Sequence, residues 1–336
     1  MSERIAVVSE GPATGPRCAE STRVAGLEPV ASVSGVSGML LVEWPLPWPR
    51  DAGEIEALAP VVQRISALAG KGAEYRLQLV TPAMGAPDPA ARRVVRYTRS
   101  SGAFHRFEST EEVVAADQVV DAAVALLDWP ASPEPCAGAE AVPVDVLVCG
   151  HGSRDVCCGS MGTALARKLG GRGRGAERVR VWRTSHLGGH RFAPTAAFLP
   201  TGQVWGHLDV DVAERVIAET LSEAGIRRHF RGTLGISSGA TQVVEREALC
   251  AVGWSWARCR REVEAIREVD RAVWQVRMVF EDLSGRHHGL VTAELRHDGE
   301  VAIPACRGVG QAAAYPLWRV DDFRVDSDLP SVRLSG

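Results

Sequence analysis

The sequence contains very little lysine and no long apolar segment. Only Lys71 and Lys168 are lysines, so arginine carries almost all of the positive charge. The net charge is −3 at pH 7 and the arginines are scattered, which gives no reason to expect nucleic acid or an anionic membrane as a partner. No apolar run reaches the roughly 18 residues of a membrane span, and the N-terminal residues lack the apolar core of a signal peptide. We therefore expect a cytoplasmic protein.

Three motifs with well-understood chemistry are also missing. The sequence has no Gly-x-x-x-x-Gly-Lys-Ser/Thr phosphate loop, and no convincing Gly-x-Gly-x-x-Gly follows a predicted strand, so nucleotide-dependent enzymes are weakly supported. It also has no Cys-x-x-Cys, the motif typical of thioredoxin-like redox proteins. A disulfide between the adjacent Cys157 and Cys158 would be strained. Thiol–disulfide exchange, using Cys149 or Cys157 with Cys158, is therefore only an alternative.

The eight cysteines are unevenly distributed along the chain. In a reducing compartment they should be mostly thiols, and clustered cysteines are then more typical of metal binding or catalysis than of structural disulfides. Cys18 stands alone and is interpreted as an ordinary thiol and not a ligand. The three cysteines nearest the C-terminus have spacings that match no metal-binding motif. In order, the cysteines are Cys18, Cys136, Cys149, Cys157, Cys158, Cys250, Cys259 and Cys306.

The stretch from Val144 to Leu208 carries the candidate site. A strand predicted over Val144–Val148 ends at Cys149, and a glycine-containing loop follows, with Cys157 and Cys158 just ahead of a predicted helix. A thiol at the N-terminus of a helix is stabilised as the thiolate by the unsatisfied backbone N–H groups. This loop is therefore a suitable place for a metal-binding sulfur.

A histidine pair completes the set of potential ligands. His186 and His190 follow about three dozen residues after Cys149, separated from each other by a leucine and two glycines. Two thiolates and two imidazoles, with one cysteine to spare, suit a soft metal ion or an iron–sulfur cluster. Tetrahedral zinc and a 2Fe–2S cluster with mixed ligands both fit this set. At this point the choice between Cys157 and Cys158, and a role for His151, stay open.

The length of 336 residues and the order of the predicted elements indicate an α/β protein of two or three domains. In residues 139–225 we expect a strand, a helix, a strand, a hairpin and a helix, which fits a thioredoxin-like layer of helices on a mixed sheet. Residues 36–138 form an N-terminal α/β half of similar element order. We expect residues 226–336 to form a small C-terminal α+β extension. Residues 1–35 are rich in Gly, Ser, Pro and Ala, so we expect a loosely ordered N-terminus.

Further expectations concern the less regular segments. Asp51 is expected to cap one helix and Thr110 to begin another. The hydrophobic pattern favours a strand over Ala103–Phe107 and a helix over Trp256–Ile266. Residues 129–138, with three prolines and a glycine, are expected to form a turn-rich linker.

Two motifs in the central stretch are long enough to be specific. The first is Cys149-Gly-His-Gly-Ser-Arg-Asp-x-x-Cys158-Gly, and the second is His186-Leu-Gly-Gly-His-Arg-Phe-Ala193. Together they resemble the sucrase/ferredoxin-like family, which is similar to the thioredoxin-like 2Fe–2S ferredoxins. The family pattern implies a cluster held by two Cys and two His, which here are Cys149, Cys158, His186 and His190.

The resemblance extends over roughly residues 15–225 and includes an upstream Leu-Leu-Val-Glu-Trp-Pro-Leu-Pro-Trp48, similar to the N-terminal segment of bacterial members. The sequence departs from the family pattern at Cys157, where we expect a residue without a thiol, so Cys157 and His151 are kept as alternative ligands. The sucrase label has no support, because no pair of carboxylates stands in a recognisable glycosidase context. We expect no sucrase activity.

Mixed ligation implies a function. Clusters with two imidazoles in place of thiolates have potentials of about −150 to +300 mV, against about −400 mV for plant-type ferredoxins. Each imidazole can also exchange a proton at its other ring nitrogen, which makes the potential depend on pH. We therefore expect a proton-coupled one-electron carrier, not a catalyst of its own, reduced by a flavin- or NAD(P)H-dependent reductase and oxidised by an unknown acceptor. The alternatives are a structural zinc-binding module and a thiol–disulfide oxidoreductase.

Overall fold

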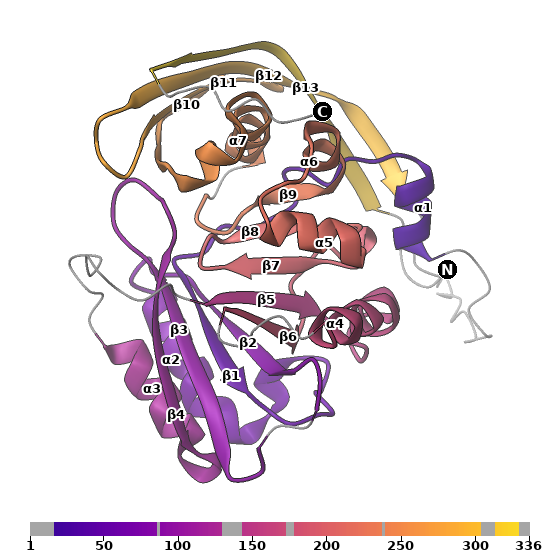
Figure 1. The fold of residues 1–336 in the computed structure, drawn as a ribbon, viewed down its shortest axis with the longest axis vertical. Coiled ribbons are helices and arrows are strands. Elements are labelled where there is room, and N and C mark those ends of the chain that lie inside the picture. Colours follow the sequence, from indigo (N-terminus) through magenta and orange to yellow (C-terminus); the bar gives the residue numbers. More distant parts are fainter. Residues whose placement is uncertain are drawn as a thin grey trace, which may run out of the picture.

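The structure is a computed structural model that describes residues 17–85, 88–129, 143–172, 178–236, 239–303 and 313–328. These residues build two β-sheets and the helices that cover them (Figure 1). The first sixteen residues, most of the linker expected after Trp129, and two cysteines, Cys136 and Cys306, lie outside the described residues.

A mixed sheet of nine strands forms the centre of the molecule, in the order β4-β3-β1-β2-β6-β5-β7-β8-β9. Its strands are β1 (Gly38–Glu43), β2 (Tyr75–Pro82), β3 (Ala91–Arg99), β4 (Phe107–Ala115), β5 (Val144–Cys149), β6 (Val179–Thr184), β7 (Ala196–Leu199), β8 (Gln203–Trp205) and β9 (Phe230–Thr233).

The sheet contains the same four-strand arrangement twice. In the first half, β1 is parallel to β2 and antiparallel to β3, which pairs antiparallel with β4. In the second half, β5, β6, β7 and β8 take the corresponding places with the same directions. The halves meet where β2 and β6 pair antiparallel at their C-terminal ends. The carboxyl ends of β1 and β5 therefore both face the junction between the halves.

Short helices and helical turns cover the sheet, with α2 and α3 together on the first half and α4 and α5 beside the second (Figure 1). The helices are α1 (Cys18–Val24), α2 (Ala59–Ala69), α3 (Val119–Asp128), α4 (Thr163–Gly170), α5 (Val210–Ile217), α6 (Glu223–His229) and α7 (Gly239–Val252). The turns are η1 (Ala52–Glu54), η2 (Glu56–Leu58), η3 (Ala116–Gln118), η4 (Cys158–Gly162), η5 (His190–Phe192) and η6 (Gly253–Arg258). Among the described residues, every helix is too short or too polar to cross a lipid bilayer.

Strand β1 explains why an unbroken apolar run becomes a central strand. Successive side chains of a strand point to opposite faces of the sheet. Leu40 and Val42 enter the core formed with α2 and α3, whereas Met39 and Leu41 enter the larger core shared with the second half. Because both faces are covered, the strand is apolar throughout instead of alternating.

One buried carboxylate joins the two halves. Asp145 on β5 is fully buried and accepts hydrogen bonds from Tyr97 on β3, from Arg180 at 2.7 and 2.6 Å, and from the indole of Trp182 at 2.7 Å. Burial, and then the charge of Asp145, raise the pKa of Tyr97 well above its usual value, so the phenol remains a donor. A buried charge is tolerated where it is paired and hydrogen-bonded in this way.

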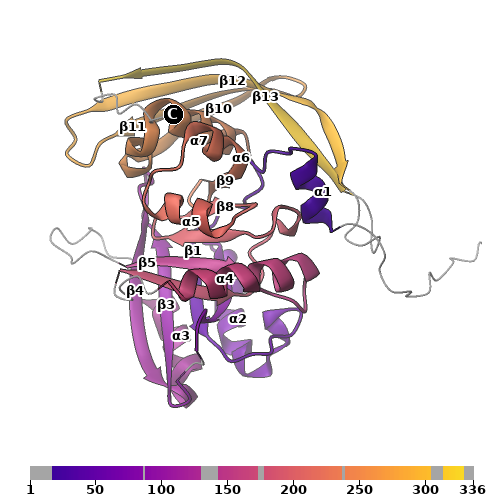
Figure 2. The ribbon, with the colours of Figure 1, turned by 45° about the vertical axis from the view of Figure 1, so that its right-hand side comes forward.

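A second sheet of four antiparallel strands arches over α7 at one end of the molecule (Figures 1 and 2). Its strands are β10 (Arg260–Asp270), β11 (Val273–Glu281), β12 (His288–Ile303) and β13 (Ala313–Ser327). With α6 and α7, it forms the mixed α and β arrangement expected after residue 225. This segment is not separate from the central sheet, because β9 pairs with β8.

Several local expectations are wrong. Asp51 caps a helical turn as expected, but that turn is η1, and η2 follows before α2 begins. Phe107–Ala115 is a strand, so the strand expected over Ala103–Phe107 lies later and no helix begins at Thr110. The segment Trp256–Ile266 divides between η6 and β10. Strands β4 and β10 lie at sheet edges, and each pairs with the strand next to it in the sequence, so this pairing, and not local preference, decides the conformation.

The expectation that residues 1–35 are loosely ordered is also wrong for part of the segment that the structure describes. Residues Cys18–Val24 form helix α1 instead of a loose segment, and Cys18, Ala19 and Thr22 of this helix are buried. Polar and small residues dominate this stretch, so its order comes from packing on the rest of the protein and not from a strong local pattern.

A buried ion pair joins the second sheet to α7, and removing its cation should be costly. Arg261 on β10 donates to Glu245 on α7 at 2.7 Å, and both side chains are 1 % exposed. The substitution Arg261→Met would leave the Glu245 carboxylate buried without its partner, which typically costs about 3–5 kcal/mol. We expect that loss in the free energy of unfolding measured by urea titration. Arg261→Met combined with Glu245→Leu should recover much of it, and equal stability of the single and double variants would contradict this prediction.

Candidate metal centre

The end of β5 and the start of the next helix bring Cys149 and Cys158 together. Cys149 is the last residue of β5, and Cys158 begins the π-helical turn η4, which continues into α4. Gly162 allows this turn to pack directly on the strand, since a Cβ atom there would lie 1.8 Å from the carbonyl oxygen of Cys149. Only glycine fits at such a distance, so this close approach depends on Gly162.

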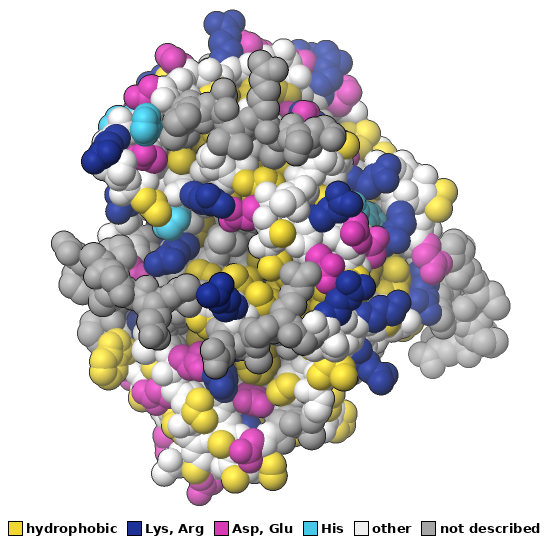
Figure 3. Space-filling view, in the orientation of Figure 1, with side chains coloured by type: hydrophobic (Ala, Val, Ile, Leu, Met, Phe, Trp, Pro, Cys, Tyr) yellow, Lys and Arg dark blue, Asp and Glu magenta, His cyan; other side chains and the backbone are white. Residues whose placement is uncertain are grey.

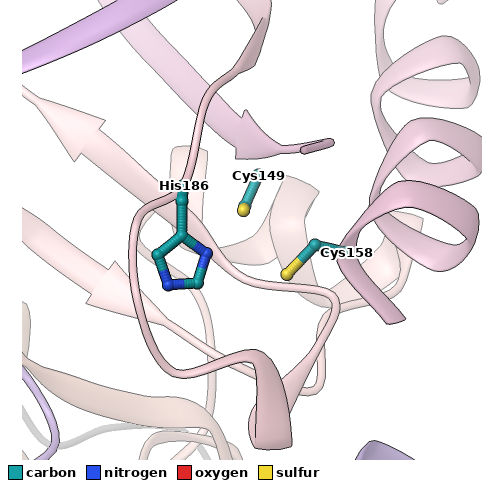
Figure 4. Close-up of side chains that lie close together, drawn as sticks. All are labelled: Cys149, Cys158 and His186. Atoms are coloured by element: carbon teal, nitrogen blue, oxygen red, sulfur yellow. The ribbon is translucent and has the colours of Figure 1, made fainter. Parts of the chain in front are cut away.

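Three side chains form a compact group of potential ligands (Figure 4). The sulfur atoms of Cys149 and Cys158 and a ring nitrogen of His186 all lie within 4.8 Å of one another. Both cysteines are buried and His186 is half-buried. The Nδ1 atom of His186 is buried without a hydrogen-bond partner in the described part of the chain, which is unusual unless a ligand satisfies it. The donor types and this atom fit a soft metal ion or a cluster.

The two cysteines have opposite acidities. Hydrogen bonding from Cys158, followed by the neighbouring imidazole of His186 and the backbone N–H of Leu187, lowers the pKa of the Cys149 thiol well below its usual value. The same contact with Cys149, together with burial, raises the pKa of Cys158. In this contact Cys158 is the hydrogen-bond donor and Cys149 the acceptor. A metal would displace that proton, because the thiolate is the metal-binding form.

Asp155 fixes the loop between the two cysteines. One carboxylate oxygen, Oδ1, accepts hydrogen bonds from the backbone N–H groups of Cys157 at 2.8 Å and Cys158 at 3.2 Å. The other oxygen, Oδ2, lies 3.6 Å from Nδ1 of His190. One side chain therefore positions the backbone of one predicted ligand and faces the ring of another.

His190 lies next to the group of three but is not part of it. Gly188 and Gly189 have φ angles of 82° and 69°, so the chain turns sharply after His186, and His190 begins η5. The ring centres of His186 and His190 are 6.4 Å apart. Burial lowers the pKa of His190, which keeps the imidazole neutral at pH 7 and able to bind a metal. Three of the four expected ligands are thus gathered, and the fourth is adjacent.

The two alternative ligands point elsewhere. His151 uses both ring nitrogens: Nε2 lies 2.7 Å from the carbonyl oxygen of Pro49, and Nδ1 accepts the backbone N–H of His186 at 3.2 Å. The sulfur of Cys157 lies 3.7 Å from that of Cys18. His151 therefore positions His186, and Cys157 contacts a cysteine that we expected to stand alone.

A buried arginine, Arg231, and a half-buried one, Arg76, support the loop between the histidines, and sequence reasoning missed both. Arg231 is 1 % exposed and donates to the carbonyl oxygens of Gly188 at 3.2 Å and Ser32 at 2.6 Å. Arg76 donates to the carbonyl oxygen of Leu187 at 3.5 Å. Neither arginine forms a salt bridge among the described residues. No local signal marks them in an arginine-rich sequence, because Arg231 follows Gly188 by 43 residues.

The C-terminal sheet reaches the same loop. Tyr315 on β13 packs its ring against Phe192 of η5, with ring centres 5.1 Å apart, and donates its hydroxyl to the carbonyl oxygen of Val30 at 2.7 Å. The turn that carries His190 is therefore held from one side by β13. The extension thus supports the candidate centre, a role that the sequence did not indicate.

A buried histidine close to this turn should make the protein sensitive to acid. His207 packs against Phe192, and burial together with the charges of Arg23, His229 and Arg231 lowers its pKa to about 3. The pKa of this histidine in the unfolded chain is about 6.5. Between about pH 6.5 and pH 3, the unfolded chain therefore binds a proton at His207 that the folded chain does not bind. Stability therefore falls as the pH decreases through this range, by up to about 1.4 kcal/mol per pH unit.

Replacing this histidine tests the expectation. The backbone of His207 is left-handed, with φ of 52°, so His207→Asn is a suitable variant because asparagine tolerates this conformation. Urea midpoints measured from about pH 7 to pH 4 should fall less steeply for His207→Asn than for the wild type. Parallel curves would show that His207 does not carry the acid sensitivity.

Comparisons with known proteins agree with the motifs. The sucrase/ferredoxin-like family model matches residues 29–232, a range that includes Cys149, Cys158, His186 and His190. A curated relative, "Altered inheritance of mitochondria protein 32" of Meyerozyma guilliermondii, is 33 % identical over 94 residues. That match covers 26 % of this chain and 33 % of the relative, so it spans about a third of that protein. No solved structure matches the chain. Since the family model covers more than half of its length, the chain belongs to the sucrase/ferredoxin-like family.

Proposed function

We propose that this protein is a one-electron carrier that binds a 2Fe–2S cluster through Cys149, Cys158, His186 and His190. The observation that carries the proposal is the gathering of two thiol sulfurs and an imidazole nitrogen within 4.8 Å, with a second imidazole beside them. The ferredoxin-like family supports it. When bound, such a cluster supplies reversible one-electron transfer at a potential above that of all-cysteine clusters.

The surrounding residues divide the site into a buried and an outer side. Cys149 and Cys158 are fully buried, whereas the side chain of His190 is 30 % exposed. We infer that electrons enter and leave on the histidine side. His190 would bind through Nε2, which leaves Nδ1 facing Asp155 to hold or release a proton as the charge at the site changes.

We also propose that each half of the central sheet is a thioredoxin-like unit. The repeated order of parallel and antiparallel strands, with helices against the sheet, supports this assignment. Only the second half carries the cysteines and histidines of the site. The loop that follows β1 instead packs on the cysteine loop, where the carbonyl oxygens of Trp48 and Pro49 accept hydrogen bonds from Ser153 and His151.

The first experiment is spectroscopy of anaerobically purified protein, with iron and acid-labile sulfide assayed on the same sample. We expect a brown protein with about two irons and two sulfides per chain, and an EPR signal of mixed-ligand type after dithionite. The midpoint potential should fall by about 59 mV per pH unit where one proton accompanies one electron. A midpoint potential that does not depend on pH would contradict the proton coupling, but it would not contradict the one-electron carrier.

Zinc is the second candidate, because the same group fits a single tetrahedral ion. Three donor atoms within 4.8 Å, of thiol and imidazole type, suit a Cys2His2 zinc site as well. A colourless protein with one zinc per chain, and no iron after reconstitution, would contradict the electron-carrier proposal and support a structural zinc module. If the cluster is present, a flavin- or NAD(P)H-dependent reductase is the proposed donor, tested by reduction of the brown protein in stopped flow.

A further inference from the structure

The thiols of Cys18 and Cys157 face each other beside the candidate metal centre. Cys18 begins α1, and Cys157 immediately precedes Cys158 at the start of η4. Their sulfur atoms are 3.7 Å apart, and both side chains are fully buried. This separation exceeds the about 2.05 Å of a disulfide bond, but only a small movement is needed to close it. Two segments 139 residues apart in the sequence therefore present adjacent thiols.

Contacts on both sides of Cys18 determine this placement. Arg17 donates to the hydroxyl of Ser160 in η4 at 3.0 Å, and the hydroxyl of Thr22 donates to the carbonyl oxygen of Arg191 in η5. Figure 2 shows α1 lying beside the ends of β12 and β13. Helix α1 thus touches both loops of the candidate centre, and the Cys18–Cys157 contact is part of that interface.

We propose that Cys18 and Cys157 form a redox-active dithiol site whose substrate is a small disulfide of the glutathione class. The pair is distinct from the group of three potential ligands, since that group consists of Cys149, Cys158 and His186, whereas the sulfurs of Cys18 and Cys157 contact each other. Cys157 is also the position at which the sequence departs from the family motif. The proposal needs no metal and does not rest on the proposed function.

The exchange proceeds in two steps that balance. One cysteine, as the thiolate, attacks a sulfur of glutathione disulfide, so that a mixed disulfide forms and one glutathione thiolate leaves. The second cysteine then attacks the protein sulfur of the mixed disulfide and releases the second glutathione. Two electrons pass from the cysteines to glutathione disulfide, and the two cysteine protons end on the two glutathione thiols. The product is one bond between Cys18 and Cys157.

Access to the buried pair requires α1 to move away from η4. This helix has seven residues, and short peripheral helices open locally at a free energy well below that of global unfolding. Once formed, the bond would hold α1 permanently against both loops and fix the backbone next to Cys158. Oxidation would therefore convert a reversible contact over the candidate centre into a covalent one.

Figure 3 shows basic, acidic and apolar side chains on one face of the molecule. Because both thiols are fully buried, the rate of oxidation should follow the opening of α1. This expectation concerns the rate alone, and peptide mapping of the cysteine variants identifies the linked cysteines.

The test is peptide mapping after incubation of the full chain with glutathione disulfide. Trypsin cleaves after Arg17, Arg23, Arg154 and Arg167, so Cys18 lies in peptide 18–23 and Cys157 in peptide 155–167. After acid quench and alkylation, we expect these two peptides to be joined, and the joined species to disappear on treatment with dithiothreitol. Cys18→Ser and Cys157→Ser should each abolish it, whereas Cys250→Ser, which alters the half-buried Cys250, should leave it unchanged.

Two results would overturn the proposal. One is a link that survives Cys157→Ser but is lost in Cys158→Ser, which would place the bond on the candidate metal ligand. The other is wild-type protein that, even in urea concentrations that open α1, carries only single glutathione adducts or none. Because the wild-type protein decides this second case, poor folding of a variant does not obscure it. Cys149→Ser, which should abolish metal binding, should still form the link, so failure of the proposed electron carrier remains a separate result.

Discussion

Cys158→Ser should abolish retention of the metal or cluster, whereas Cys157→Ser should leave it in place. The sulfur of Cys158 lies within 4.8 Å of Cys149 and His186, while the sulfur of Cys157 is directed at Cys18. Removing residues that only support metal ligands already costs about 10–100-fold in affinity, so loss of a thiolate ligand should cost more. Iron and sulfide content, with the visible spectrum, measures the difference after reconstitution under identical conditions.

The two variants are matched controls for each other. They change the same atom in adjacent, fully buried residues of one loop, so a general effect of serine in this loop would appear in both. Equal loss of metal in Cys157→Ser and Cys158→Ser would show that the ligand is not determined by the geometry of this loop. Retention in Cys158→Ser and loss in Cys157→Ser would reverse the assignment of the two cysteines.

Gly189→Ala should destabilise the histidine loop far more than Gly188→Ala. Both glycines have positive φ angles, so alanine at either site costs about 1–2 kcal/mol in backbone strain. A Cβ atom on residue 189 would in addition lie 2.1 Å from a nitrogen of Arg231, whereas nothing lies within 4 Å of one on residue 188. Forcing an additional atom into such a packed site typically costs a further amount of about 1–3 kcal/mol.

Urea unfolding and metal content together test this difference. We expect Gly189→Ala to lose about 2–5 kcal/mol of unfolding free energy and to retain little metal, and Gly188→Ala to lose about 1–2 kcal/mol. The cost of Gly189→Ala should shrink in an Arg231→Ala background, since the two residues are in contact and their effects are not additive. Equal costs of the two glycine substitutions would mean that the guanidinium moves aside freely.

Elements with a strong local pattern were predictable, and elements whose residues suit more than one structure were not. The strand that ends at Cys149 matches expectation, because its apolar run is contiguous in the sequence. The edge strand Phe107–Ala115 was missed because half-buried and exposed residues alternate after Phe107, and its glutamates also suit a helix. Its conformation is set by pairing with β3.

The sequence by itself determined the types of the candidate ligands and their order: a cysteine at the end of a strand, a cysteine at a helix start, and two histidines separated by glycines. Only the tertiary structure decided which of two adjacent cysteines faces the site, because Cys157 and Cys158 have the same chemistry and leave the loop in different directions. It also brought Arg231, Tyr315 and Cys18 to the site from distant segments. Such contacts form when sheets and helices pack together, and a local pattern of residues does not predict them.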